Sequence, residues 1–125
     1  MSKKKSCGLG IATLLLASAT ALAQQPATWG TQADSLRGRN GQQATFSCPP
    51  GGTPSDRLWG TDLYTDDSSI CTAAVHAGKI TAARGGKVTV EIRPAAQAYR
   101  GSVHNGVTSN DYGAFSGSFV LVGQR

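Results

Sequence analysis

One segment, residues 66–78, predicts a short helix that restricts what the chain can fold into. Asp66, Asp67 and Ser68 supply N-cap oxygens and negative charge at its start, and Gly78 stands where a left-handed C-cap belongs. Between them, the apolar residues at helical spacing are Ile70, Ala73, Ala74 and Ala77. A helix of about two to three turns is not stable alone in water. Because its side chains are small, we expect strands to enclose it closely.

Short stretches on both sides of this helix predict strands. The clearest are Gln43–Ser47, Lys87–Ile92 and Gly117–Val122, while Leu58–Tyr64 predicts a shorter, partly buried strand. The 16 Gly and five Pro residues favour turns, and the Asn105-Gly106 pair favours a hairpin turn. Strands before and after one buried helix predict an α+β domain.

The start of the chain has the pattern of a secretory signal peptide over residues 1–23. Lys3–Lys5 are positive, Leu9–Leu16 is apolar, and Ala21–Ala23 supplies a small-residue cleavage site. The alternative is a retained N-terminal anchor, but a spanning helix needs about 20 apolar residues and this run is shorter. We therefore expect a protein that is secreted or periplasmic, with no integral membrane segment after removal of the signal.

The rest of the chain is long enough for one domain. Residues 24–41 are polar with little periodicity and predict a flexible N-terminal arm, so the folded domain is expected over residues 42–125. Nine of the 12 basic residues lie after the predicted signal, together with all seven acidic residues, and they form no basic cluster. A nucleic-acid partner is therefore not expected.

Two cysteines, Cys48 and Cys71, follow the predicted signal, whereas Cys7 lies within it. In an exported chain of this size they most simply form one disulfide, which would contribute about 3 kcal/mol by the chain-entropy model. A metal-binding pair or redox-active thiols are the alternatives, although the CxxC spacing is absent.

Catalysis has little support in the sequence. His76, late on the predicted helix, is explained by the favourable place of a partial positive charge at a helix C-terminus. His104 is expected on the surface, and neither histidine has zinc-ligand spacing. A hydrolase using His76 with Asp67 or Ser69 is the weakest hypothesis, because no GxSxG elbow is present. The densest acidic group, which offers oxygens to a cation but lacks the calcium-loop pattern, is Asp62, Asp66 and Asp67.

Binding has more support than catalysis. Arginine suits bidentate contacts with phosphates and carboxylates, and tyrosine supplies contact area with a polar end. The candidate ligand-binding residues are Arg57, Tyr64, Arg84, Arg93, Tyr99 and Arg100. Lys79 and Lys87 could add point charges. Trp59 and Tyr112 are further large amphipathic side chains, but Trp59 is more readily explained as a core residue.

The chain resembles the LCCL domain family over roughly Gln42 to Val122. The matching segments are Cys48–Gly52, Leu58–Gly78, Gly85–Val90, Tyr99–Ser102, Asn105–Ser109 and Ser118–Phe119. The residues that we assign to its structural signature are Trp59, Gly60, Asp67, Ser68, His76 and Gly78.

The resemblance implies an extracellular module in which one central helix is wrapped by short antiparallel strands. The family is not known as an enzyme, so the resemblance implies no enzymatic activity. We also expect no cofactor and no metal. It suggests an anionic envelope or matrix ligand, such as lipopolysaccharide, and the alternative is a structural or protein-interaction domain without a small-molecule ligand. Animal members commonly carry four cysteines in two disulfides, so their pairing cannot be copied here and Cys48–Cys71 follows only because no other partners remain.

Overall fold

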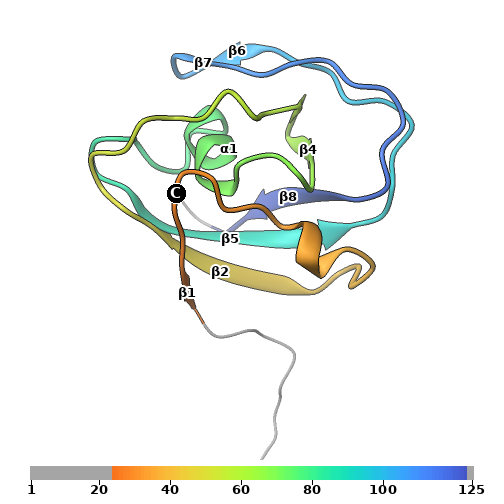
Figure 1. The fold of residues 1–125 in the computed structure, drawn as a ribbon, viewed down its shortest axis with the longest axis horizontal. Coiled ribbons are helices and arrows are strands. Elements are labelled where there is room, and N and C mark those ends of the chain that lie inside the picture. Colours follow the sequence, from red (N-terminus) through yellow and green to blue (C-terminus); the bar gives the residue numbers. More distant parts are fainter. Residues whose placement is uncertain (1–23, 124–125) are drawn as a thin grey trace, which may run out of the picture.

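The computed structural model of the protein describes residues 24–123 (Figure 1). The predicted signal peptide lies outside the described residues. In chain order the elements are β1 (Gln25–Pro26), a 3₁₀ turn (Asp34–Leu36), β2 (Gln43–Cys48), β3 (Gly60–Thr61), β4 (Leu63–Thr65), α1 (Ile70–His76), β5 (Gly86–Arg93), β6 (Val103–His104), β7 (Val107–Thr108) and β8 (Ser118–Val122). Strands precede and follow one short α-helix within the described part of the chain, which confirms the predicted α+β class.

Six of these strands form one sheet in the order β1-β2-β5-β8-β4-β3. Neighbouring strands are antiparallel, except that β1 runs parallel to β2. β6 and β7 pair separately as a hairpin. Helix α1 lies between the sheet and this hairpin (Figure 1) and contacts β5 on one side and β7 on the other. Strands therefore enclose the helix on two sides.

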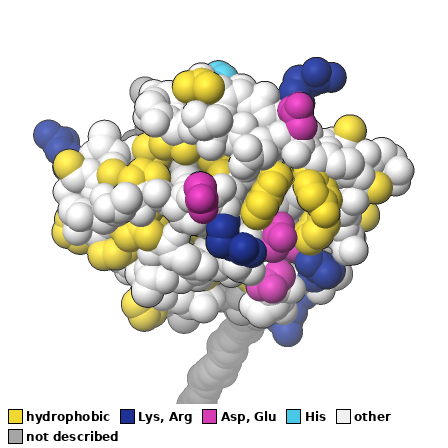
Figure 2. Space-filling model, turned by 45° about the horizontal axis from the view of Figure 1, so that its top comes forward, with side chains coloured by type: hydrophobic (Ala, Val, Ile, Leu, Met, Phe, Trp, Pro, Cys, Tyr) yellow, Lys and Arg dark blue, Asp and Glu magenta, His cyan; other side chains and the backbone are white. Residues whose placement is uncertain are grey.

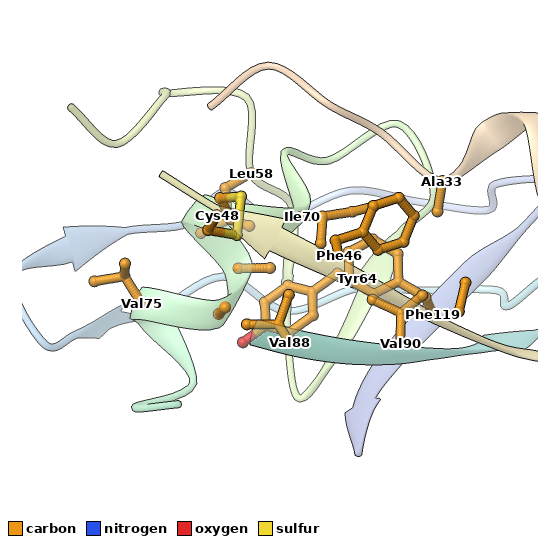
Figure 3. Packing of buried hydrophobic residues seen from close by; sticks show 14 of the residues in the cluster. Ala33, Phe46, Cys48, Leu58, Tyr64, Ile70, Val75, Val88, Val90 and Phe119 are labelled. Carbon is orange, nitrogen blue, oxygen red and sulfur yellow. A yellow bond between two sulfur atoms is a disulfide. The ribbon is translucent and has the colours of Figure 1, made fainter. Parts of the chain in front are cut away.

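The core fills the space between the sheet and the helix. Val88, Val90 and Ile92 alternate along β5 and are buried, whereas the residues between them are partly exposed. Phe46 from β2 and Phe119 from β8 belong to the same buried cluster (Figure 3). Every residue of α1 is buried as well. The period-two pattern of the sequence thus identified the inner face of the sheet correctly.

A disulfide joins Cys48, at the end of β2, to Cys71 in the first turn of α1. The two Cα atoms are 5.8 Å apart, and both residues are buried in the core. The predicted pairing is confirmed. Among the described residues it leaves no cysteine thiol for metal binding or redox chemistry.

Helix α1 begins later than its acidic flank suggests. Its N-cap is Ser69, which has an extended backbone and whose Oγ accepts a 3.1 Å hydrogen bond from the Thr72 amide. Residues 66–68, expected as capping residues, precede this position. Asp66 instead accepts two hydrogen bonds from Arg37. The expectation was wrong because a cap must lie next to the first helical residue, and Ser69 has the required oxygen.

The Asn105-Gly106 turn joins β6 to β7, as predicted. The φ angles of the two residues are 53° and 77°, both in the left-handed region. A two-residue hairpin turn of type I′ requires positive φ at both central positions, and Asn and Gly are the residues that adopt it most readily.

The predicted flexible arm is instead packed against the domain. Residues Gln25–Pro26 pair with β2, and Ala33 is fully buried. The Ala33 amide donates to the Asp66 carbonyl at 3.0 Å, and the Thr31 carbonyl accepts from the Ile70 amide at 2.9 Å. Sequence periodicity missed this segment because hydrogen bonds, rather than a repeated apolar face, hold it in place.

Candidate binding groove

A groove of about 670 Å³ opens beside the C-terminal end of α1. It is bounded by the end of the helix, the turn that follows it and the β6–β7 hairpin. Its apolar lining comes from Pro54, Val75, Ile80 and Val107, and its basic lining comes from Lys79 and Arg84. The groove therefore combines an apolar wall with two cations.

The end of the helix gives the groove one of its edges. Gly78 has a φ of 79°, and its amide donates to the Val75 carbonyl at 3.0 Å, while the Lys79 amide donates to the Ala74 carbonyl at 2.8 Å. These paired bonds form a Schellman motif, which reverses the chain sharply. The prediction that Gly78 ends the helix in a left-handed conformation is confirmed. The turn brings Lys79 and Ile80 to the groove.

A second turn positions Arg84. The Gly85 amide donates to the Thr81 carbonyl at 2.8 Å, and the Arg84 amide donates to Thr81 Oγ1 at 3.2 Å. Gly85 has a φ of 63°, and a Cβ at this position would collide with the Cys48 carbonyl. The close approach to the end of β2 therefore requires glycine at this position.

The two groove cations are not neutralised by carboxylates in the described part of the chain. The salt bridges found there belong to Arg37 and Arg93. Lys79 Nζ donates to the Gly123 carbonyl at 3.3 Å, which leaves its charge uncompensated. Because Arg84 is also exposed, the groove presents net positive charge to solvent.

His76 lies buried behind the groove. Its Nδ1 is 2.9 Å from the Tyr64 hydroxyl, and its Nε2 is 3.2 Å from the Ser102 carbonyl oxygen. Burial lowers the pKa of His76, and the neighbouring His104 lowers it further. Burial likewise raises the pKa of Tyr64 to about 12. His76 is therefore a neutral core residue, which corrects the expectation of a cation at the helix end.

The hydrogen bonds of His76 also argue against the hydrolase hypothesis. A carbonyl can only accept, so Nε2 carries the ring proton and donates to Ser102, while Nδ1 accepts from the Tyr64 hydroxyl. Neither ring nitrogen is then available as a base. Ser69 is engaged as the helix cap and donates to the Trp29 carbonyl.

The structure does not bring the six candidate ligand-binding residues together. Tyr64 and Tyr99 are buried, at 0% and 4% exposure, so their side chains cannot meet a ligand at the surface. Both have apolar rings large enough to fill the core, which composition alone cannot distinguish from contact residues. Of the four arginines, only Arg84 lines the groove.

The other three arginines lie elsewhere. The Arg57 guanidinium is 5.6 Å from the centre of the Trp59 ring, Arg93 forms a salt bridge with Glu91, and Arg100 lies exposed in a shallow hollow that Asp111 also lines.

The structural signature residues mostly support the fold. Trp59 is only half-buried, so it is less internal than expected, and its amide donates to the buried Ser68 hydroxyl at 3.1 Å. Gly60 has a φ of 105°, and a Cβ there would collide with the Leu63 carbonyl in the β3–β4 turn. Asp67 is half-buried, and its Oδ1 is buried without a hydrogen-bond partner.

The three aspartates do not form a cation site. Asp66 is fully buried and pairs with Arg37 through two hydrogen bonds of 2.8 and 2.7 Å. Asp62 is exposed on the β3–β4 turn, with a φ of 67°. Within residues 24–123 no group of three or more acidic, histidine or cysteine side chains is arranged to hold a metal ion. No helix within these residues is long and apolar enough to cross a membrane.

Sequence reasoning missed most of the groove lining. Val75, Ile80 and Val107 are isolated apolar residues from three segments, and nothing in their spacing places them together. The available signals were the Gly78 cap and the Asn105-Gly106 turn. Both mark reversals of the chain, and a groove lies between them.

The family model for the LCCL domain matches residues 19–119. Human cochlin is 34% identical over 119 residues, which is 91% of this chain and 21% of cochlin. Clotting factor C of Tachypleus tridentatus is 35% identical over 80 residues, 63% of this chain and 8% of that protein.

Human cysteine-rich secretory protein LCCL domain-containing 2 is 46% identical over 56 residues, 45% of this chain and 11% of that protein. The chain thus spans between 8% and 21% of the length of these curated relatives. The family match also includes the packed segment 24–41, which the sequence had placed outside the domain.

Proposed function

The chain belongs to the LCCL domain family, and from this premise we propose that it is an exported, non-catalytic binding module whose groove takes an anionic ligand with an apolar part, such as lipopolysaccharide. One relative is named as a secretory protein, which supports export, as does the signal-peptide pattern of the sequence.

The composition of the groove carries this proposal. Lys79 and Arg84 offer charge to a phosphate or carboxylate, and the half-buried Pro54 and Ile80 offer an apolar surface to acyl chains, above a nearly buried floor of Val75 and Val107. Ligand sites in proteins are commonly concave and apolar, with a few polar groups that fix orientation. A purely polar anion would leave the apolar wall uncovered, and a neutral lipid would leave the two cations without a partner. An anionic amphiphile satisfies both.

We propose a non-catalytic module because the side chains near the groove do not form a catalytic arrangement. Both ring nitrogens of His76 are engaged in hydrogen bonds, and burial lowers its pKa. Within the described residues no other histidine, cysteine or acidic group gathers into a metal centre. Binding is the activity that remains for a groove of this kind.

Titration calorimetry of the purified protein with lipopolysaccharide, at low and at moderate salt, tests the proposal. We expect saturable binding that weakens as salt rises, because ionic contacts at an exposed groove are screened. Arg84→Gln and Lys79→Gln should each weaken binding by roughly threefold to tenfold. Arg100→Gln removes the same charge outside the groove and should leave the affinity unchanged.

Two results would contradict the proposal. Absence of heat at both salt concentrations would favour the alternative, a domain that docks a protein partner. An equal loss of affinity in Arg84→Gln and Arg100→Gln would show that only net charge matters and that the groove is not the site.

A further inference from the structure

A row of aromatic rings with an arginine at each end crosses a second part of the surface. We call it the aromatic strip, and its residues in spatial order are Arg57, Trp59, Tyr112, Phe115 and Arg37. The centres of the Trp59 and Tyr112 rings are 6.3 Å apart, and those of Tyr112 and Phe115 are 5.6 Å apart, both in edge-to-face contact. The guanidinium carbons lie 5.6 and 5.3 Å from the terminal rings. No residue of the strip lines the groove.

The strip is accessible to a ligand. Tyr112 is 47% exposed and is one of two large hydrophobic residues that are exposed in the described part of the chain, Val103 being the other. Trp59 and Phe115 are half-buried, which fixes their rings and leaves part of each at the surface. In Figure 2 hydrophobic side chains gather beside basic and acidic side chains on the face turned to the reader. Contiguous exposed apolar surface often marks a binding site, and the Tyr112 ring adjoins two partly exposed rings.

The backbone under the strip is already paired. Tyr112 exchanges both of its backbone hydrogen bonds with Tyr99, and Phe115 does the same with Ala96. An extended peptide that adds to a sheet needs a free edge of amides and carbonyls. The strip offers rings and a guanidinium instead, so its ligand must be recognised through side chains.

The two arginines differ in the charge that they offer. Arg37 is neutralised by Asp66. Arg57 has no carboxylate within salt-bridge distance among the described residues. With the amide oxygen of Gln32 turned toward the guanidinium, that oxygen accepts from Arg57 Nη2 at 3.1 Å and from Nε at 3.3 Å. One end of the strip therefore presents a fixed cation that lacks an anion.

We propose that the aromatic strip binds a polysaccharide whose sugars carry carboxylates. The apolar C–H face of a pyranose ring packs on the face of an aromatic ring, and the exposed Tyr112 ring offers that surface to one sugar of the chain. Trp59 and Phe115 meet Tyr112 edge-to-face and hold its ring in place, while each has a guanidinium over its own ring. The carboxylate of one sugar pairs with Arg57 in the bidentate geometry that arginine favours. The site is separate from the groove and does not rest on the function proposed for it.

Calorimetry of the purified protein with polygalacturonate and with its fully methyl-esterified form tests this inference. The ester keeps the sugar rings and removes the negative charge. We expect the acid to bind about tenfold more tightly than the ester, and Arg57→Gln to abolish that difference. Tyr112→Ser should weaken both polymers at least tenfold, because it removes the exposed ring that both sugars contact.

Matched variants separate this site from the groove. Val103→Ser removes the other exposed apolar side chain and Arg84→Gln removes a groove cation, and neither should change binding of the two polymers. Circular dichroism of each variant verifies that the fold is intact. If the unaltered protein binds polygalacturonate but not lipopolysaccharide, the groove proposal alone is wrong.

Three results would overturn the inference. The first is that neither polymer binds. The second is that Arg84→Gln weakens the binding of polygalacturonate as much as Arg57→Gln does. The third is that polyglutamate binds as tightly as polygalacturonate. The last result would assign the strip to acidic peptides rather than to sugars.

Discussion

The two ends of helix α1 are built in opposite ways. At the N-terminal end, the Ser69 cap, the Cys71 disulfide and the Arg37–Asp66 pair join the helix to the sheet and to the N-terminal segment. At the C-terminal end the helix stops at the glycine of a Schellman motif, and the β6–β7 hairpin lies over it (Figure 1). Asn105 Nδ2 donates to the His76 carbonyl at 2.9 Å and holds the hairpin there.

If the groove binds a ligand as proposed, this difference places stability at one end of a short helix and binding at the other. The N-terminal end has a covalent bond and an ion pair whose carboxylate is fully buried, and both resist local opening. The C-terminal end has a few hydrogen bonds and an open groove, and regions that bind ligands are commonly drawn from the less stable parts of a fold. Perturbations at the first end should therefore cost more stability than those at the second.

Arg37→Gln should have the largest effect. It removes the partner of the fully buried Asp66 carboxylate, and a buried charge without its partner costs about 3–5 kcal/mol. Chemical denaturation should show that loss in the free energy of unfolding. Arg39→Gln is the control, because Arg39 is exposed and forms no salt bridge in the described structure, and it should change stability by less than about 0.5 kcal/mol. Equal effects of the two variants would show that the pair does not anchor this end.

Reduction of Cys48–Cys71 should have the next largest effect. The bond closes a loop with a sequence separation of 23, for which chain entropy gives about 3 kcal/mol. Thermal unfolding with and without reductant measures the shift in midpoint. A variant with both cysteines changed to alanine should match the reduced protein and should not respond to reductant. An unchanged midpoint on reduction would show that the disulfide does not stabilise this end of the helix.

The sequence predicted the elements whose signals are local. Alternating residues identified β2, β5 and β8, the Asn105-Gly106 pair identified the hairpin, and Gly78 identified the end of the helix. Each of these depends on neighbours within a few residues. The helix start was misplaced because four polar residues in a row, Asp66 to Ser69, all suit a cap.

The features that the sequence did not predict depend on distant contacts. Arg37 and Asp66 are 29 residues apart, and their pairing fixes the segment that was expected to be flexible. The groove and the aromatic strip each join three segments that are distant in sequence, so neither leaves a motif in the sequence. Tyr64 and Tyr112 belong to one residue type, yet one is fully buried and the other is half exposed. Only the fold distinguishes a buried tyrosine from an exposed one.

The buried histidine at the C-terminal end of the helix should make the stability of the protein depend on pH. His76 faces Tyr64, His104 and the charge of Asp62, and burial places its pKa below the ordinary 6.5. Below pH 6.5 the unfolded chain binds a proton at this histidine before the native protein does, so acid favours unfolding. Stability should fall with a slope of up to about 1.4 kcal/mol per pH unit, from about pH 6.5 down to the native pKa.

Denaturation at several pH values measures this slope, and two variants test whether His76 is the residue that causes it. His76→Gln should remove the dependence in this window even if it lowers stability at pH 7.5. His104→Gln should retain most of it, because burial is the larger cause of the low pKa. An NMR titration of His76 with a midpoint at or above 6.5 would contradict the neutral, buried state. The helix would then end on a cation beside the groove, and acid would strengthen that end instead of opening it.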